Sequence, residues 1–234
     1  MKILALDSSA IVATVALCED EALLGELTVN NGNTHSETLL PMVEFLLDRF
    51  GLTPDDLDAL AVSKGPGSFT GVRIGAATVK GLAFGTSLPC VGVSTLEALA
   101  YNLIGYDGLI CPVMNARRKQ VYTALFRAKD GVLERILPDQ AIAIAELDEK
   151  LKAFDEPVRL VGDGYDITEE LLTHEILPTP IRLRAQSAYS VAQVAKLLLA
   201  NGFDGKDTDL APSYLRLSQA ERERAEKMAI DTGI

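Results

Sequence analysis

The chain has 234 residues, 48% of them hydrophobic and 24% charged, which is typical of a globular protein with ample core material and excludes a disordered one. The net charge of −11 predicts repulsion from phosphate, so tight RNA binding by this chain alone is not expected. The first apolar stretch is cut at Asp7, and no apolar run approaches the roughly 20 residues of a membrane span, so we expect a cytoplasmic protein without a membrane contact.

The first hundred residues predict three strands, a helix, a strand, a helix, a strand and a further helix. The strands are the apolar, β-branched segments 2–6, 11–17, 22–29, 59–63 and 90–93. The first long helix has Thr34 and Glu37 at capping-box spacing, apolar residues at helical spacing up to Phe50, and Gly51 placed to end it. A short helix at 53–56, a glycine-rich loop at 65–69, a helix from 70 to about 84 and a helix begun by Ser94 and Glu97 complete this half.

The second half repeats this theme. Strands are expected at 109–114, 120–126, 132–136 and 158–161, with a hairpin signal at Asp130-Gly131, and helices at 145–153 and 187–200. The pattern indicates an α/β fold with two lobes, each a mixed sheet with helices, and suggests a structural duplication. The loop 105–108 predicts a boundary between lobes 1–104 and 105–234, with 218–234 as a charged helix or tail.

Most enzyme motifs are absent from the sequence. The loop 65–71 has neither the lysine of a phosphate-binding P-loop nor the glycine spacing of a dinucleotide site, and no H-x-x-x-H or C-x-x-C pair predicts a metal site. His35 and His174 are the only histidines, and no spacing supports a catalytic triad around either of them. We therefore predict no catalytic residue, no metal and no cofactor for this chain.

Two segments keep two interpretations each. Asp7, Ser8 and Ser9 form either a plain turn or the carboxylate end of a nucleotide cleft like that of sugar kinases. The dense basic cluster Arg117-Arg118-Lys119 is by default a solvated hairpin turn, and the alternative is a contact with RNA or with an acidic partner.

Small residues follow one strip of the second long helix, because Gly71, Gly75, Thr78, Gly81 and Gly85 are three or four residues apart. Glycine destabilises a helix interior by up to about 1 kcal/mol, so close approach of another segment is expected to compensate. Packing within the chain and contact with a partner chain are both consistent with the strip. His35, in the first turn of the other long helix, is expected to pack or to contact a partner rather than to catalyse.

Several runs together resemble the TsaB (YeaZ) family. The most specific is Gly65-Pro66-Gly67-Ser68-Phe69-Thr70-Gly71, and the match continues more weakly through 115–118 and 212–216. The other supporting runs are 3–9, 35–37 with 39–41, 72–75, 80–83 and 92–99. The resemblance implies a two-lobed fold of the sugar kinase, actin and heat-shock chaperone type.

The resemblance also implies a function. It predicts a non-catalytic subunit that pairs with the related catalytic subunit TsaD, joined by the ATPase TsaE, and the complex rather than this chain uses ATP and magnesium. The complex transfers threonylcarbamoyl from threonylcarbamoyl-AMP to the tRNA adenosine beside the anticodon, and this chain meets tRNA only through it. The metal histidines of TsaD correspond here to Thr95 and Leu99.

The two long helices of the first lobe would form the interface with TsaD, and without TsaD the same face would form a homodimer. The expected interface residues are His35, Leu39, Leu40, Val43, Leu47, Gly71, Gly75 and Thr78. The alternatives are a stand-alone glycoprotease-like hydrolase and a nucleotide-binding kinase relative that uses Asp7.

Overall fold

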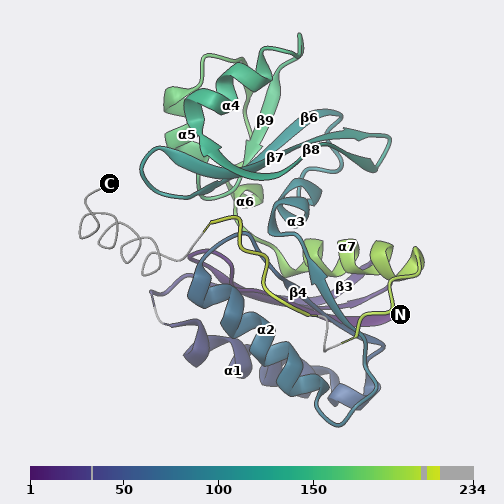
Figure 1. The fold of residues 1–234 in the computed structure, drawn as a ribbon. Helices are drawn as coiled ribbons and strands as arrows, with labels where there is room; N and C mark the ends of the chain where they lie inside the picture. Colours follow the sequence, from purple (N-terminus) through teal and green to yellow (C-terminus); the bar gives the residue numbers. More distant parts are fainter. Residues whose placement is uncertain (33, 207–209, 217–234) are drawn as a thin grey trace, which may run out of the picture.

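The computed structural model describes residues 1–32, 34–206 and 210–216. Two five-stranded sheets lie one above the other, each with helices on both faces (Figure 1). The charged segment 218–234, expected to be a helix or tail, lies outside the described residues.

The first sheet contains the predicted N-terminal meander and two parallel strands. Its order is β3-β2-β1-β4-β5, where β1 runs antiparallel to β2 and parallel to β4. The central strands are apolar on both faces and almost entirely buried, as expected for strands covered on both sides. The strands are β1 (Lys2–Asp7), β2 (Ala13–Glu19), β3 (Ala22–Val29), β4 (Ala59–Ser63) and β5 (Cys90–Val93).

The second sheet has the same strand arrangement as the first. Its order is β10-β9-β6-β7-β8, in which β6 again lies between an antiparallel neighbour and a parallel one. The shared order confirms the structural duplication that the sequence suggested. The strands are β6 (Gly108–Asn115), β7 (Gln120–Lys129), β8 (Val132–Ala143), β9 (Val158–Val161) and β10 (Ile176–Leu177).

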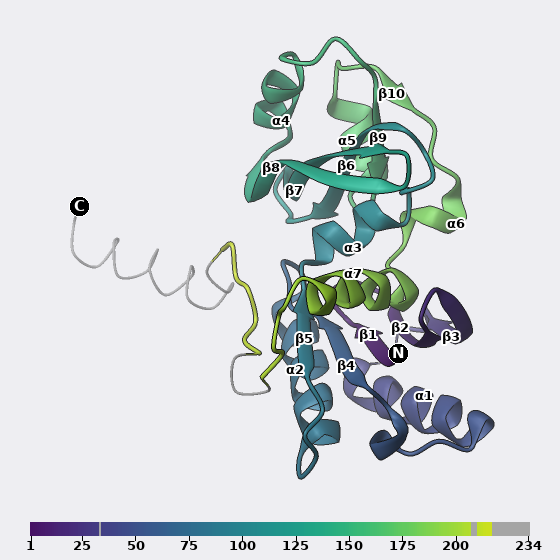
Figure 2. The same ribbon diagram turned by 90° about the vertical axis from the view of Figure 1, so that its right-hand side faces the viewer.

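The outer faces of the two sheets are covered by helices of their own half of the chain. Helices α1 (His35–Phe50) and α2 (Phe69–Ala83) lie side by side under the first sheet, and the 3-10 helix η1 (Pro54–Asp56) joins α1 to β4 (Figures 1 and 2). Helices α4 (Ile144–Leu151) and α5 (Tyr165–Leu171) cover the second sheet, and α6 (Ile181–Arg184) precedes the last described helix.

The two helices between the sheets each pack on the sheet formed by the other half of the chain, and we call them the exchanged helices. Helix α3 (Thr95–Tyr101) belongs to the first half, yet its leucines pack into the core of the second sheet. Helix α7 (Ala188–Ala200) belongs to the second half, and its alanines and valines pack on the first sheet. The expected boundary at 104/105 thus separates the sheets but not their cores.

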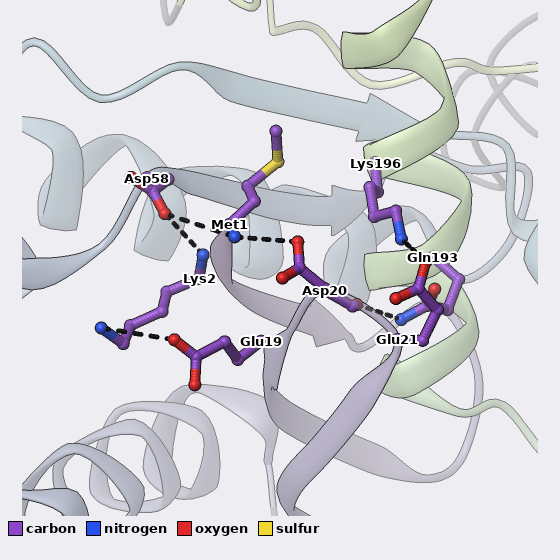
Figure 3. Close-up of polar contacts among 8 residues, drawn as sticks. All are labelled: Met1, Lys2, Glu19, Asp20, Glu21, Asp58, Gln193 and Lys196. Atoms are coloured by element: carbon purple, nitrogen blue, oxygen red, sulfur yellow. Dashed lines mark hydrogen bonds and ion pairs between the residues drawn. The ribbon is translucent and has the colours of Figure 1, made fainter.

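Polar contacts fasten α7 to the first sheet, as Figure 3 shows. Gln193 donates to the backbone carbonyl of Asp20 at 3.0 Å, and Lys196 forms an ion pair with Glu21. The amino group of Met1 lies 2.9 Å from the carboxylate of the same Asp20. The turn between β2 and β3 therefore holds both the N-terminus and the helix that covers its sheet.

The helix caps differ from the prediction at one of two places. At α3 the hydroxyl of Ser94 accepts from the amide of Glu97 at 3.3 Å, as its spacing predicted. At α1 the capping box is wrong, because the Thr34 side chain makes no cap hydrogen bond and its hydroxyl lies 3.1 Å from that of Ser36. Gly51 does end α1, in a left-handed conformation with φ of 62°.

Candidate functional site

A cleft of about 580 Å³ lies between the two lobes. This volume is within the range of small-molecule sites, roughly 300–1,000 Å³. Its walls come from segments that are distant in the sequence. They are the loop after β1 (Ser9, Ala10, Ile11), the glycine-rich loop 66–70, the β6–β7 hairpin with Tyr122, the residue Asp163 after β9, and residues 213–216.

The carboxylate of Asp7 is turned into its own lobe. One oxygen accepts from the amide and the hydroxyl of Ser9 at 2.8 and 2.6 Å, and the other accepts from the hydroxyl of Ser63. Burial raises the pKa of Asp7, although these hydrogen bonds act in the opposite direction. Among Asp7, Ser8 and Ser9, only Ser9 lines the cleft.

Ser8 is engaged with α2 rather than with the cleft. Its hydroxyl donates to the carbonyl of Gly71 at 2.9 Å. A Cβ at Gly71 would collide with the Ser8 carbonyl, and one at Gly75 would lie 2.7 Å from the Ser8 hydroxyl. A Cβ at Gly67 would collide with the carbonyl of Ser9 in the same way. These glycines therefore let α2 and its preceding loop lie directly against the loop after β1.

Asp163 is the cleft residue that the sequence analysis missed. It is exposed toward the cleft, and one carboxylate oxygen accepts from the amide of Asn115 at 3.1 Å. The protein around its carboxylate removes part of the solvating water and thereby raises the pKa of Asp163, and the negative charge of Asp7 adds to the effect. The signal that could have found it is Gly162-Asp163-Gly164, placed directly after the predicted strand 158–161.

Residues 210–216, here called the strap, cross from one lobe to the other at the mouth of the cleft. The amide of Ser213 donates to the carbonyl of Lys64 at 2.6 Å, and Arg216 donates to the carbonyl of Ala116 at 2.7 Å. The ring of Tyr214 stacks on Phe69 with 4.5 Å between centroids. The strap therefore joins the glycine-rich loop of the first lobe to the β6–β7 hairpin of the second.

His35 anchors the loop after β1 to the start of α1. Its Nε2 lies 2.8 Å from the carbonyl oxygen of Ala10, and since a carbonyl only accepts, Nε2 carries the proton. The other histidine, His174, likewise contacts a backbone carbonyl, that of Glu156 at 3.0 Å. Both imidazoles thus bind backbone carbonyls rather than a serine hydroxyl, which weakens the hydrolase alternative.

The expected interface residues divide between the core and the surface. Leu39, Val43 and Leu47 are at most 6% exposed and face the first sheet, so they cannot meet a partner directly. Gly71 and Gly75 pack within the chain, which supports the intramolecular interpretation of that part of the strip. Thr78 is half-buried and Leu40 is 45% exposed.

A different set of residues on the same two helices points to solvent. We call it the outer face. On α1 it contains Leu40 and Phe45, the latter 48% exposed; on α2 it contains exposed Ala77 and Gly81 and ends at Phe84, which is 89% exposed. Apolar rings and small residues exposed on two adjacent helices are typical of a contact surface for another chain.

The described residues contain no group of three or more histidine, cysteine or carboxylate side chains that could hold a metal ion. Thr95 and Leu99, which correspond to metal histidines in the resemblance, are 0% and 1% exposed. Within the same part of the chain, no helix has both the length and the apolar character to cross a membrane.

The family model for TsaD, tRNA N6-adenosine threonylcarbamoyltransferase, matches residues 29–224. The tRNA threonylcarbamoyladenosine biosynthesis protein TsaB of Bacillus subtilis is 36% identical over 222 residues, which cover 94% of this chain and 96% of the relative. The solved structure of YeaZ from Pseudomonas aeruginosa superposes with a TM-score of 0.74 at 27% identity, over 92% of this chain and 99% of that one.

A more distant structure shares the fold alone. Component A of the (R)-2-hydroxyglutaryl-CoA dehydratase from Acidaminococcus fermentans has a TM-score of 0.51 at 12% identity, covering 86% of this chain and 99% of that one. The expected two-lobed α/β fold, with one mixed sheet in each lobe, is therefore confirmed and also occurs in a protein that is only distantly similar in sequence.

Proposed function

The chain belongs to the TsaB (YeaZ) family of tRNA threonylcarbamoyladenosine biosynthesis proteins, and from this premise we propose that it is a non-catalytic subunit of the transferase complex. It pairs with a TsaD-type catalytic subunit and, through that pair, with a TsaE-type ATPase. ATP and magnesium serve the complex, and the complex transfers threonylcarbamoyl to the tRNA adenosine beside the anticodon.

The observation that carries the proposal is the outer face of α1 and α2. Its exposed leucine, phenylalanines and small residues lie on the first lobe, whose two long helices contact TsaD according to the family resemblance. Burying such a face removes apolar surface from water, which favours association with a partner chain. Without TsaD, the same face supports a homodimer.

The absence of catalytic chemistry in this subunit is supported by α3. By the family resemblance, Thr95 and Leu99 stand where the catalytic relative has its metal histidines, and neither side chain binds metals as imidazole does. Both side chains are buried, and Leu99 packs in the second lobe's core against other apolar side chains.

The nucleotide-binding alternative has weaker support. A kinase-like role needs the Asp7 carboxylate to face the cleft, where it would hold magnesium directly or through water. Its oxygens instead accept hydrogen bonds from Ser9 and Ser63. Tight, magnesium-dependent ATP binding by the isolated chain, abolished in Asp7→Ala, would favour this alternative over the scaffold role.

The proposal is tested by mixing the chain with its TsaD-type partner and measuring complex formation by size-exclusion chromatography and calorimetry. We expect a joint peak, and Ala77→Arg should weaken the affinity by about ten-fold or more because it places a charge in the apolar contact. Val132→Arg is the matched control, since Val132 is 66% exposed on β8 of the other lobe.

Two results would count against the proposal. Transferase activity by the isolated chain would remove the non-catalytic role. Equal affinities for Ala77→Arg, Val132→Arg and the unchanged chain would remove the outer face as the interface.

A further inference from the structure

A group of cations gathers where the strap meets the β6–β7 hairpin. Arg117, Arg118 and Lys119 form the hairpin turn, and all three are exposed. Arg216 comes from the strap and Arg73 from α2. We call these five residues the basic rim.

Contacts make the basic rim one continuous surface. Arg73 donates from Nε to the hydroxyl of Tyr214 at 2.7 Å, and its guanidinium lies 3.9 Å above the ring of Phe69. Arg216, two residues after Tyr214, donates to the carbonyl of Ala116, which directly precedes the hairpin cations. Residues from α2, the strap and the second lobe therefore border the same cleft mouth.

The basic rim contrasts with the charge of the whole chain, which has 33 acidic and 22 basic residues. Although acidic residues predominate, three cations are adjacent in sequence here and two more are joined to them by contacts. Such a concentration of positive charge produces a local positive potential that attracts an anion. Asp163 contributes a carboxylate to the lining of the cleft, and the backbone amide of Asn115 donates a hydrogen bond to it.

The hairpin turn also has an uncommon backbone. Arg117, Arg118 and Lys119 have φ values of 64°, 54° and 57°, in the left-handed region that long side chains rarely adopt. Three such residues in a row are strained and persist only where the surrounding structure holds them. Hydrogen bonds at both ends hold the turn: the Arg117 amide donates to the Asn115 side chain at 2.8 Å, and the Lys119 carbonyl accepts from Ile144 at 3.1 Å.

Aromatic rings lie among these cations. Tyr214, 41% exposed, stacks on Phe69, and both rings line the cleft together with Tyr122. Cations that track a backbone, interleaved with rings on which bases stack, are the pattern of single-stranded nucleic-acid sites. An acidic protein segment would use the cations but not the rings.

We propose that the basic rim contacts the phosphate backbone of the tRNA substrate within the assembled complex. This inference rests on the proposed function, because the net charge of −11 opposes tight RNA binding by the isolated subunit. Arg118 and Lys119 bind phosphates, and the Phe69–Tyr214 pair offers a surface for an unpaired base. The subunit thereby adds an RNA contact to the complex besides holding the catalytic partner.

The test uses the complex of this chain with its TsaD-type partner and an unmodified transcript of a tRNA that reads codons starting with A. Binding is measured at several potassium chloride concentrations for the unchanged complex and for Arg118→Gln/Lys119→Gln. The control is Lys150→Gln/Lys152→Gln, which removes the same charge near α4 on the same lobe. Complex formation without tRNA is measured for each variant.

We expect the rim variant to assemble normally and to bind tRNA several-fold more weakly. The slope of log affinity against log salt should become shallower by about 1 for each phosphate that the variant no longer neutralises. The control should change neither quantity.

Three outcomes would overturn the inference. Unchanged tRNA affinity and slope in an intact complex would remove it while leaving the proposed function standing. Loss of assembly in the rim variant alone would instead assign the rim to an acidic protein partner. Failure of the unchanged chain to assemble would remove both proposals.

Discussion

Gly71 and Gly81 occupy the same helix, but their missing side chains have opposite consequences. A Cβ at Gly71 would collide with the backbone carbonyl of Ser8, which the fold holds in place through the Ser8–Gly71 hydrogen bond. A Cβ at Gly81 would meet nothing within 4 Å. The glycine at 71 is thus required by packing within the chain, whereas the one at 81 has no packing role in the isolated chain and weakens the helix there.

We predict that Gly71→Ala destabilises the isolated chain by about 1–3 kcal/mol through overpacking. Gly81→Ala should stabilise it by about 0.5–1 kcal/mol, because alanine is the better helix former in an open position. Urea unfolding of the two variants beside the unchanged chain measures both effects. Equal stability of the two variants would show that the loop after β1 can move to accommodate a side chain at position 71, and it would contradict the argument that packing requires glycine there.

The sequence predicted the glycine strip but not how its positions differ. Spacing of three and four residues placed Gly71, Gly75 and Gly81 along one strip, and nothing in the pattern told which of them meets a carbonyl. That depends on the loop after β1, which lies 63 residues earlier in the chain. Asp163 was missed for a similar reason. The sequence shows only a short Gly-Asp-Gly segment after a strand, and its place in the cleft depends on how the two lobes face each other.

The strap shows how one short element is held by contacts from two lobes. We predict that Tyr214→Ala speeds hydrogen exchange at the Ser213 amide by about five-fold, because the ring contributes about 1 kcal/mol through stacking and its cation contact. Tyr214→Phe should have a smaller effect, since it keeps the ring and removes only the hydroxyl that accepts from Arg73.

Exchange measured by mass spectrometry or nuclear magnetic resonance distinguishes the two variants, with the amides of β1 as the internal reference. If exchange at Ser213 is unchanged in Tyr214→Ala, the hydrogen bond to Lys64 holds the strap without help from the aromatic pair.

Long elements were predicted from sequence better than short ones. The apolar periodicity of α1, α2 and α7 and the β-branched runs of the central strands gave nearly their observed bounds. Helix α5, strand β10 and helix α6, of 7, 2 and 4 residues, were missed, because they have neither the capping residues that marked the equally short α3 nor the valine-rich runs that marked β5 and β9. Strand β8 continues to Ala143, well beyond the predicted end at Ile136.

At the scale of the molecule, the exchanged helices make each lobe depend on the other half of the chain. We predict that the fragment 1–104 does not fold cooperatively alone, because the upper face of its sheet is covered by α7. Mixing fragments 1–104 and 105–234 should restore a cooperative unfolding transition. Near-ultraviolet circular dichroism and urea titration test both statements, and a cooperative transition in the isolated fragment 1–104 would contradict the first.

The sequence could not have shown this exchange. The predicted boundary was the loop 105–108, where the chain does pass from one sheet to the other, and the repeated pattern predicted two lobes, each a mixed sheet with helices. Which sheet an amphipathic helix covers is decided by tertiary packing, and α3 and α7 are both apolar enough to serve either sheet.

The exchange also imposes an order in time on the newly made chain. As the chain leaves the ribosome from its N-terminus, the first sheet emerges without its upper cover and must wait until α7 follows, after the whole second sheet. At ordinary rates of synthesis, about 5–20 residues per second, that interval lasts several seconds. During it, the apolar faces of β1, β2 and β4 are open to chaperones, so the nascent first lobe should be a client of the cell's folding machinery even though the finished protein is compact.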